Sequence, residues 1–252
     1  DGAGGVYLAG SYKTNITIGG IYLAADNTNS EQGFVFHWNS SGNVVWANSI
    51  GDLNGSNLHD YASSIIVDQN NDILVAGNLR VNIAGGSQRS KHFIKRYDAG
   101  GMLMTTVEST EFSSNWYETW GVKINTDNNG NIYLFTGFDN DPTNFAFNSF
   151  PLDPILSTSH ILYKMDINFS VLNAINFGTT ELKANQIITL SNNDVILRSK
   201  DQSQYIIDNN VYLQDVNQQG TITHLDSNNS FIKFHTIGNN IGTQDAISIT
   251  SD

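Results

Sequence analysis

The amino-acid sequence repeats itself, and this feature constrains the fold more than any other. Four similar segments each join a polar turn to a short apolar strand: Asp1–Gly10, Asp68–Gly77, Asp127–Thr136 and Leu190–Ser199. Successive segments begin about 60 residues apart, a period typical of propellers and related repeat architectures. Repeats that begin near residues 1, 68, 127 and 190 predict a single repeat domain over residues 1–252.

Two further patterns recur within the repeats. A strand, an Asn or Asp, a short polar turn and another strand occupy residues 34–44, 93–103, 161–171 and 221–231. A short run, rich in β-branched residues, occurs at 62–67, 120–125, 184–189 and 246–250. Each repeat therefore predicts four antiparallel strands, which in the second repeat lie near 62–67, 73–78, 92–97 and 103–107.

No segment has the periodicity of a long amphipathic helix. A four-stranded antiparallel sheet that recurs at a fixed period is typical of a propeller blade. The sequence therefore predicts an all-β fold, a β-propeller of four-stranded blades with about four repeats of ~63 residues. A β-sandwich is the alternative, but a sandwich gives no reason for a repeating sequence.

Each end of the chain is expected to supply only part of a blade. Residues 6–48 supply the second to fourth strands of a blade, and Ala246–Thr250 supplies a first strand without followers. The two parts either complete one blade of a four-bladed ring or belong to different blades of a larger ring. The start in mid-repeat, without Met, favours the larger ring, whereas contact between Val6–Ser11 and Ala246–Thr250 would establish the closed one.

Three stretches carry a resemblance to a known family. Residues 127–137 read Asp-Asn-Asn-Gly-Asn-Ile-Tyr-Leu-Phe-Thr-Gly, residues 91–98 read Lys-His-Phe-Ile-Lys-Arg-Tyr-Asp, and residues 42–46 read Gly-Asn-Val-Val-Trp. They resemble the SBBP-type bacterial β-propeller repeat, which is common in exported proteins of Bacteroidota. A small extra element at 16–23, echoed at 145–152, also fits that repeat, while Arg198 and Ser199 depart from it. The resemblance implies a propeller, export by type IX secretion, and no single activity.

Composition restricts the possible partners. The net charge of −12 disfavours nucleic acids and anionic membrane surfaces, and we expect no cluster of Lys and Arg. Cysteine is absent, which excludes disulfides, thiol catalysis and Cys-ligated zinc. No apolar run approaches the ~18 residues of a membrane-spanning helix. These features are consistent with an extracellular or cell-surface protein that needs no cofactor.

Strand order predicts two different ends for each sheet. The turns from strand 1 to 2 and from strand 3 to 4 are short and rich in Asp, Asn and Gly, so one end is uniform. The other connections are long and dissimilar, and binding residues gather on such loops. Candidate binding residues on these loops are the aromatic pair Trp116 and Tyr117, the acidic residues Asp139 and Asp141, and the neighbours His59 and Asp60.

The turn acids have the spacing of a calcium loop but lack its last ligand. Asp68 and Asp127 begin Asp-x-Asn-x-Asp and Asp-x-Asn-x-Asn runs, yet the twelfth positions hold Leu79 and Phe138. Because these acids recur in phase with the hairpins, we interpret them as turn caps. The histidines are dispersed, so no metal site is predicted. Trp46 is expected to be a structural residue of an outer strand.

No nucleophile elbow, phosphate loop or zinc motif occurs in the sequence. We therefore expect a non-enzymatic, secreted or cell-surface propeller that acts as a binding, adhesion or scaffold module. Its partners would be a protein or glycan at the cell surface, or other parts of a larger chain. The alternative is a propeller enzyme, a hydrolase or lyase that acts on polysaccharide.

Overall fold

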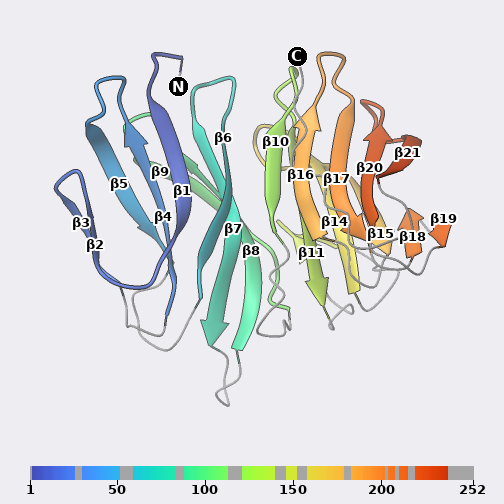
Figure 1. Cartoon of the computed structure of the whole chain (residues 1–252), viewed down its shortest axis with the longest axis horizontal. Helices are drawn as coiled ribbons and strands as arrows, with labels where there is room; N and C mark the ends of the chain where they lie inside the picture. The colour runs from blue at the N-terminus through green and yellow to red at the C-terminus, as the bar shows by residue number, and fades with distance from the viewer. Residues whose placement is uncertain are drawn as a thin grey trace. The chain divides into compact units, whose positions relative to one another are not determined.

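The structure is a computed structural model of the 252-residue chain. It describes residues 2–25, 30–51, 59–82, 88–112, 121–139, 146–151, 158–178, 183–201, 204–207, 210–214 and 219–237. The described residues form six antiparallel sheets and contain no helix (Figure 1). The all-β expectation is thereby confirmed, and none of these residues builds a helix able to cross a membrane.

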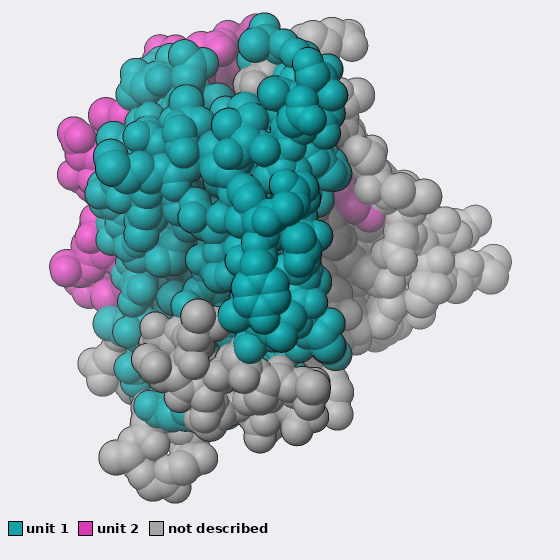
Figure 2. All heavy atoms as spheres, turned by 90° about the vertical axis from the view of Figure 1, so that its left-hand side faces the viewer, with its two compact units in different colours: residues 1–111 teal, residues 112–252 magenta. Residues whose placement is uncertain are grey.

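The chain divides into two compact units, residues 1–111 and residues 112–252 (Figure 2). The first unit holds two main sheets. The first sheet contains β1 (Val6–Tyr12), β4 (Gln32–Trp38) and β5 (Val44–Ile50). The second sheet contains β6 (Tyr61–Val67), β7 (Ile73–Asn82), β8 (Gln88–Tyr97) and β9 (Leu103–Glu108). The four strands predicted for the second repeat are thus confirmed.

The second unit also holds two main sheets. The third sheet contains β10 (Lys123–Thr126), β11 (Ile132–Asp139), β14 (Thr158–Met165), β15 (Val171–Gly178), β18 (Gln204–Ile207) and β19 (Asn210–Gln214). The fourth sheet contains β16 (Lys183–Thr189), β17 (Val195–Asp201), β20 (Gln219–Leu225) and β21 (Phe231–Ile237). Because β18 and β19 come from the β17–β20 connection, the fourth repeat contributes two strands to the third sheet.

Two small hairpins complete the described structure. They are β2 (Ile16–Ile18) with β3 (Ile21–Leu23), and β12 (Ala146–Phe147) with β13 (Phe150–Pro151). Both correspond to the extra element expected at 16–23 and 145–152. Strand β3 lies against β5, and Asn148 Nδ2 donates to Phe169 O at 2.7 Å. Each hairpin therefore lies against the outer part of its own sheet.

The tight turns have one recurring geometry. In the β6–β7 turn, Asp68 Oδ1 accepts hydrogen bonds from Asn70 N at 2.8 Å and Asp72 N at 3.0 Å. Asp127 accepts the equivalent pair at 2.9 Å each. The fourth turn residue has positive φ, as at Asn71 with φ of 62°, which Asn and Gly tolerate best. Asp68 and Asp127 are therefore turn caps, as interpreted from the sequence.

The sheets pack face to face within each unit, and they do so in the same way. In the first unit Tyr7, Ala9 and Val35 of the first sheet meet Ile73 and Val75 of the second. In the second unit the equivalent residues meet: Tyr133, Phe135 and Leu162 of the third sheet, and Val195 and Leu197 of the fourth. We call the first sheet of the first unit and the third sheet of the second unit the leading sheets. In each unit, one face of the leading sheet thus packs against the opposite face of the next sheet.

Among the described residues, the first sheet has no strand on the side of β1 away from β4, whereas each other main sheet has a strand at the equivalent place. Strand β1 pairs with β4 alone among the described residues, whereas β7, β11 and β17 each have a first strand beside them. Residues 246–250, the expected first strand, lie outside the described residues. Closure of a ring, and the arrangement of the sheets as blades about one axis, therefore stay predictions.

Candidate functional site

The best-formed polar site lies in the first unit, at the end of the sheets opposite the tight turns. We call this the variable-loop end. A short parallel bridge between Glu31 and His59 brings the start of β4 beside the start of β6. Asp60 N donates to Glu31 O at 2.8 Å. These contacts join the first sheet to the second sheet at the starts of β4 and β6.

Glu31 forms the centre of one polar cluster. Its carboxylate lies 3.4 Å from Lys13 Nζ and 3.3 Å from His59 Nδ1, and it accepts a hydrogen bond from Tyr61. Burial alone would raise the pKa of Glu31, but hydrogen bonds from Tyr61, Lys13 and His59 outweigh it and lower the pKa. Burial, reinforced by the carboxylate, raises the pKa of Tyr61 well above its usual value. Tyr61 therefore stays a neutral phenol.

Asp60, which precedes β6, is almost completely buried and contacts β7. Its Oδ1 accepts a hydrogen bond from Arg80 N at 2.8 Å. Gly51, which follows β5, approaches the same carboxylate so closely that a Cβ there would overlap Asp60 Oδ2. The φ of Gly51 is 115°, a second reason for glycine at this position. Burial also lowers the pKa of the Arg80 guanidinium, whose Nη1 donates to Gln88 Oε1 at 3.2 Å.

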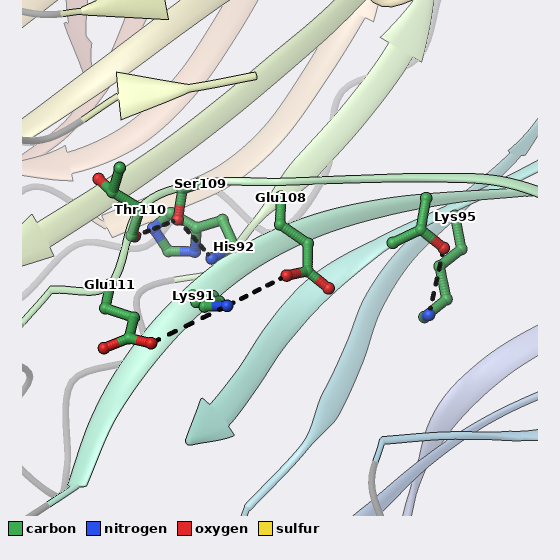
Figure 3. Close-up of polar contacts among 8 residues, drawn as sticks. Lys91, His92, Lys95, Glu108, Ser109, Thr110 and Glu111 are labelled. Carbon is green, nitrogen blue, oxygen red and sulfur yellow. Dashed lines mark hydrogen bonds and ion pairs between the residues drawn. The ribbon is translucent and has the colours of Figure 1, made fainter. Parts of the chain in front are cut away.

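A cavity of about 180 Å³ lies beside Asp60. Its walls are Gly51, Asp60, Leu79, Arg80, Val81, Lys91, Lys95 and Glu108. Figure 3 shows how the charged side chains are arranged: Lys91 Nζ lies 3.3 Å from Glu108 Oε2 and 4.0 Å from Glu111 Oε1, and Lys95 Nζ donates to Thr106 Oγ1 at 3.4 Å. The cavity thus presents ammonium and carboxylate groups together.

His92 anchors the strands behind these lysines. The side chain is fully buried, and its Nδ1 contacts Asn78 Oδ1. His92 N donates to Ser109 Oγ at 2.9 Å, and Ser109 Oγ in turn donates to Thr110 O at 2.8 Å (Figure 3). His160 occupies the equivalent position in the third sheet and is also fully buried. This recurrence identifies His92 as a structural residue of the β7–β8 pair.

The cavity is suited to hydrogen bonding more than to covalent chemistry. Each acid in its wall already has a contact: Asp60 accepts from Arg80 N, and Glu108 pairs with Lys91. Among the residues that the structure describes, no three His, Asp or Glu side chains gather in a way that could hold a metal ion. A ligand here would meet two ammonium groups and two carboxylates.

The sequence-predicted binding residues have different outcomes. Asp60 lies in the cavity wall, whereas His59 contacts Glu31 at 3.3 Å. Asp139 ends β11, where its backbone pairs with Thr158. Trp116, Tyr117 and Asp141 lie outside the described residues. The assignment of these residues to a binding function stays a prediction.

Sequence reasoning missed Lys91, Lys95 and Glu108, although a signal was present. No acidic residue occurs between Ile73 and Tyr97. Five of the twelve Lys and Arg residues lie in this β7–β8 hairpin: Arg80, Arg89, Lys91, Lys95 and Arg96. The expectation that Lys and Arg form no cluster is therefore wrong for this segment. The overall charge of −12 conceals a locally basic hairpin.

A second hollow, of about 570 Å³, lies beside the hairpin β2–β3 and is lined partly by Phe36 and Trp38. It opens on the outer face of the first sheet, where Val6 is 52% exposed. Ile73 and Val195, at the equivalent positions, are fully buried by the leading sheet of their unit. Among the described residues of the first unit, no sheet covers this apolar face, and we place the candidate site at the polar cavity.

The chain was compared with known proteins. No family model matches it, and no curated protein matches it significantly. The resemblance to the SBBP-type repeat therefore stays a prediction, and the function has to be inferred from the geometry.

Proposed function

We propose that the chain is a non-enzymatic binding module built as a β-propeller, which binds its ligand at the variable-loop end of the first unit. The observation that carries the proposal is the polar cavity beside Asp60, with Lys91, Lys95 and Glu108 in its wall. Polar and charged groups placed in the wall of a pocket fix the orientation of a ligand and give specificity.

The size of the cavity favours part of a larger ligand. At about 180 Å³ it is smaller than the ~300–1,000 Å³ of pockets that enclose whole small molecules. It fits one sugar residue of a glycan, or one side chain of a protein. Both partner classes expected from the sequence are consistent with this size.

The repeated packing of the sheets supports the propeller. In both units, one face of the leading sheet covers the opposite face of the next sheet. Repeating one head-to-tail contact generates either a ring or an open helix, and a propeller is the ring. Location at the cell surface rests on the resemblance to exported proteins.

A ligand screen with paired variants tests the binding proposal. The whole chain is screened against immobilised glycans and peptides, and each positive is measured by calorimetry with Lys95→Ala and Glu108→Gln. We expect each variant to weaken binding at least ~10-fold, because each removes a polar contact at the cavity wall. The matched control is Lys233→Ala, which removes an exposed lysine of β21.

Circular dichroism and a melting curve show that the variants are folded. Unchanged affinity in both cavity variants, or an equal loss in the Lys233→Ala control, would reject the cavity as the binding site. Turnover of a polysaccharide during the screen, measured by release of reducing ends, would instead favour the enzyme alternative.

A further inference from the structure

Strand β9, at the outer edge of the second sheet, is the most exposed strand of the first unit. It pairs with β8 on one side, and no strand among the described residues pairs with its other side. Five successive side chains, from Met102 to Thr106, are exposed. Because successive side chains of a strand point to opposite faces, both faces of β9 are open as well as its edge.

The exposed stretch at β9 begins with three apolar residues, which Thr105 and Thr106 follow. Met102, Leu103 and Met104 are 66%, 48% and 51% exposed, and the stretch from Met102 to Val107 contains no charged residue and no proline. Edge strands are ordinarily protected by lysine, proline or a covering element, because their free N–H and C=O groups pair readily with other strands. The stretch Met102–Val107 has neither lysine nor proline, so its edge can pair with another strand.

The same chain contains a model of such an addition. In the third sheet the outer strand is β15, and β18 pairs with its outer edge in antiparallel register, Phe177 opposite Ile207 and Gly178 opposite Ile206. The sequence of β18, Gln-Tyr-Ile-Ile, is uncharged and apolar. In the first sheet, the outer strand β5 has β3 lying against it. In the second repeat, only residues 83–87 separate β7 from β8.

We propose that the outer edge of β9 is a docking surface for an extended, uncharged segment of a partner protein, which adds to the second sheet as a further strand. Backbone hydrogen bonds to β9 would supply affinity, and contacts with Leu103 and Met104 would supply selectivity. This surface is separate from the polar cavity and does not depend on the function proposed for it.

The probe is a capped synthetic peptide with the sequence of residues 204–214, in which Asn replaces Asp208 so that the peptide is uncharged, because this segment supplies β18 and β19. Hydrogen exchange of the whole chain is measured with and without the peptide at about 1 mM. We expect exchange of amides within Leu103–Glu108 to slow at least ~10-fold, with no change in β21. Absence of protection in β9 would overturn the proposal.

Paired lysine variants identify the edge. Met104→Lys introduces a protective charge in β9, and Ile232→Lys does the same at the equivalent exposed position of β21. Both positions are exposed, so both variants should fold, which melting curves verify. We expect only Met104→Lys to weaken peptide binding, by at least ~10-fold.

Equal binding by the two variants would contradict the proposal. So would a concentration-dependent dimer, detected by light scattering, that Met104→Lys abolishes, because a second copy of the chain would then occupy the edge. Binding of ligands at the polar cavity should be unaffected by Met104→Lys, which separates this inference from the proposed function.

Discussion

Within each unit, a side chain of one sheet donates to the equivalent turn carbonyl of the next sheet, and the donor differs between the units. In the first unit, Trp46 Nε1 donates to Ala99 O at 3.0 Å, at the tip of the β8–β9 turn. In the second unit, the equivalent carbonyl is Ser227 O, and Lys164 Nζ donates to it at 2.5 Å. The repeat thus keeps a backbone acceptor on each turn and allows the side chain that reaches it to vary.

The surroundings of these hydrogen bonds differ as well. Trp46 is buried, stacks on Tyr97 with ring centroids 6.2 Å apart, and lies against Gly101. The second unit has a row of amide and hydroxyl contacts between β10 and β16, including Asn125 Nδ2 to Ile187 O at 3.2 Å and Thr189 Oγ1 to Thr126 O at 2.6 Å. In the first unit the amide of Asn48 also donates to Gly101 O, at 2.8 Å. The first unit thus combines a tryptophan with an amide, and the second unit combines a lysine with several small polar groups.

The largest effect should follow removal of the aromatic side chain. Trp46→Ala deletes a buried ring and its hydrogen bond, so we expect a loss of about 3–5 kcal/mol in the free energy of unfolding. Urea denaturation followed by circular dichroism measures it. Val45→Ala, at the exposed neighbouring position, is the control and should change stability by less than about 0.5 kcal/mol. A small effect of Trp46→Ala would mean that the first unit is not fastened at this point.

A glycine pair separates the contact with Trp46 from backbone strain. Gly42 and Gly101 occupy equivalent turn positions with φ of 78° and 85°, so replacement by Ala strains both backbones. Only at Gly101 would the new Cβ overlap the Trp46 ring. We expect Gly101→Ala to destabilise the protein by about 1–3 kcal/mol more than Gly42→Ala in the same urea assay.

The extra destabilisation of Gly101→Ala over Gly42→Ala should disappear when each variant is combined with Trp46→Ala, because the overlapping ring is then absent. Persistence of the excess in that background would show that Gly101 is required for a reason other than the tryptophan.

A smaller effect is expected in the second unit. Lys164→Met keeps most of the aliphatic stem but removes the hydrogen bond to Ser227 O and the ammonium group 5.5 Å from the centre of the Tyr133 ring. We expect a loss of about 1 kcal/mol in urea denaturation. Lys233→Met, at an exposed position of β21, should be neutral. A loss as large as that of Trp46→Ala would show that Lys164 contributes as much stability to its unit as Trp46 does to the first.

The smallest effect concerns acid. In the fourth sheet, Asp194 Oδ2 lies 2.8 Å from His224 Nε2. Burial opposes ionisation of Asp194, but hydrogen bonds from His224 and Asn192 outweigh it and lower the pKa of the carboxyl. A lowered carboxyl pKa adds stability above the unfolded pKa of about 4, and this stability is lost as the pH falls through the folded pKa.

Asp194→Asn should therefore destabilise the protein by less than about 1 kcal/mol at pH 6, and by less still near pH 3. Urea midpoints at the two pH values measure the difference. If Asp194→Asn lowers the stability by the same amount at both pH values, the contact between Asp194 and His224 contributes no pH-dependent stability.

The strands and turns could be predicted because their causes are local. A turn such as Asp68–Asp72 is specified by an Asp side chain that bonds to backbone groups two and four residues later. The contact between Trp46 and Ala99 joins residues 53 positions apart, and no local pattern encodes it. The sequence indicated a structural tryptophan without indicating its partner.

The conformation of Phe169 and the cavity beside Asp60 could not be predicted from the sequence, because both depend on tertiary contacts. Phe169 adopts a φ of 65° at a turn position where Gly42 and Gly101 stand in other repeats, and its ring is buried. A bulky residue in that conformation is uncommon, so the sequence alone gave no reason to expect it. The cavity beside Asp60 was equally hidden, because its wall combines Gly51 with residues of three strands.

The origin of β18 has a consequence for biosynthesis. The chain leaves the ribosome from its N-terminus, so β15 is complete at Gly178, while the strand that pairs with its outer edge begins only at Gln204. Strands β16 and β17 of the fourth sheet are made in the interval. During this time the third sheet exposes an unpaired edge, the kind of surface that nascent chains expose to misassembly. The third repeat therefore cannot finish folding by itself, and its last step waits for the translation of the fourth.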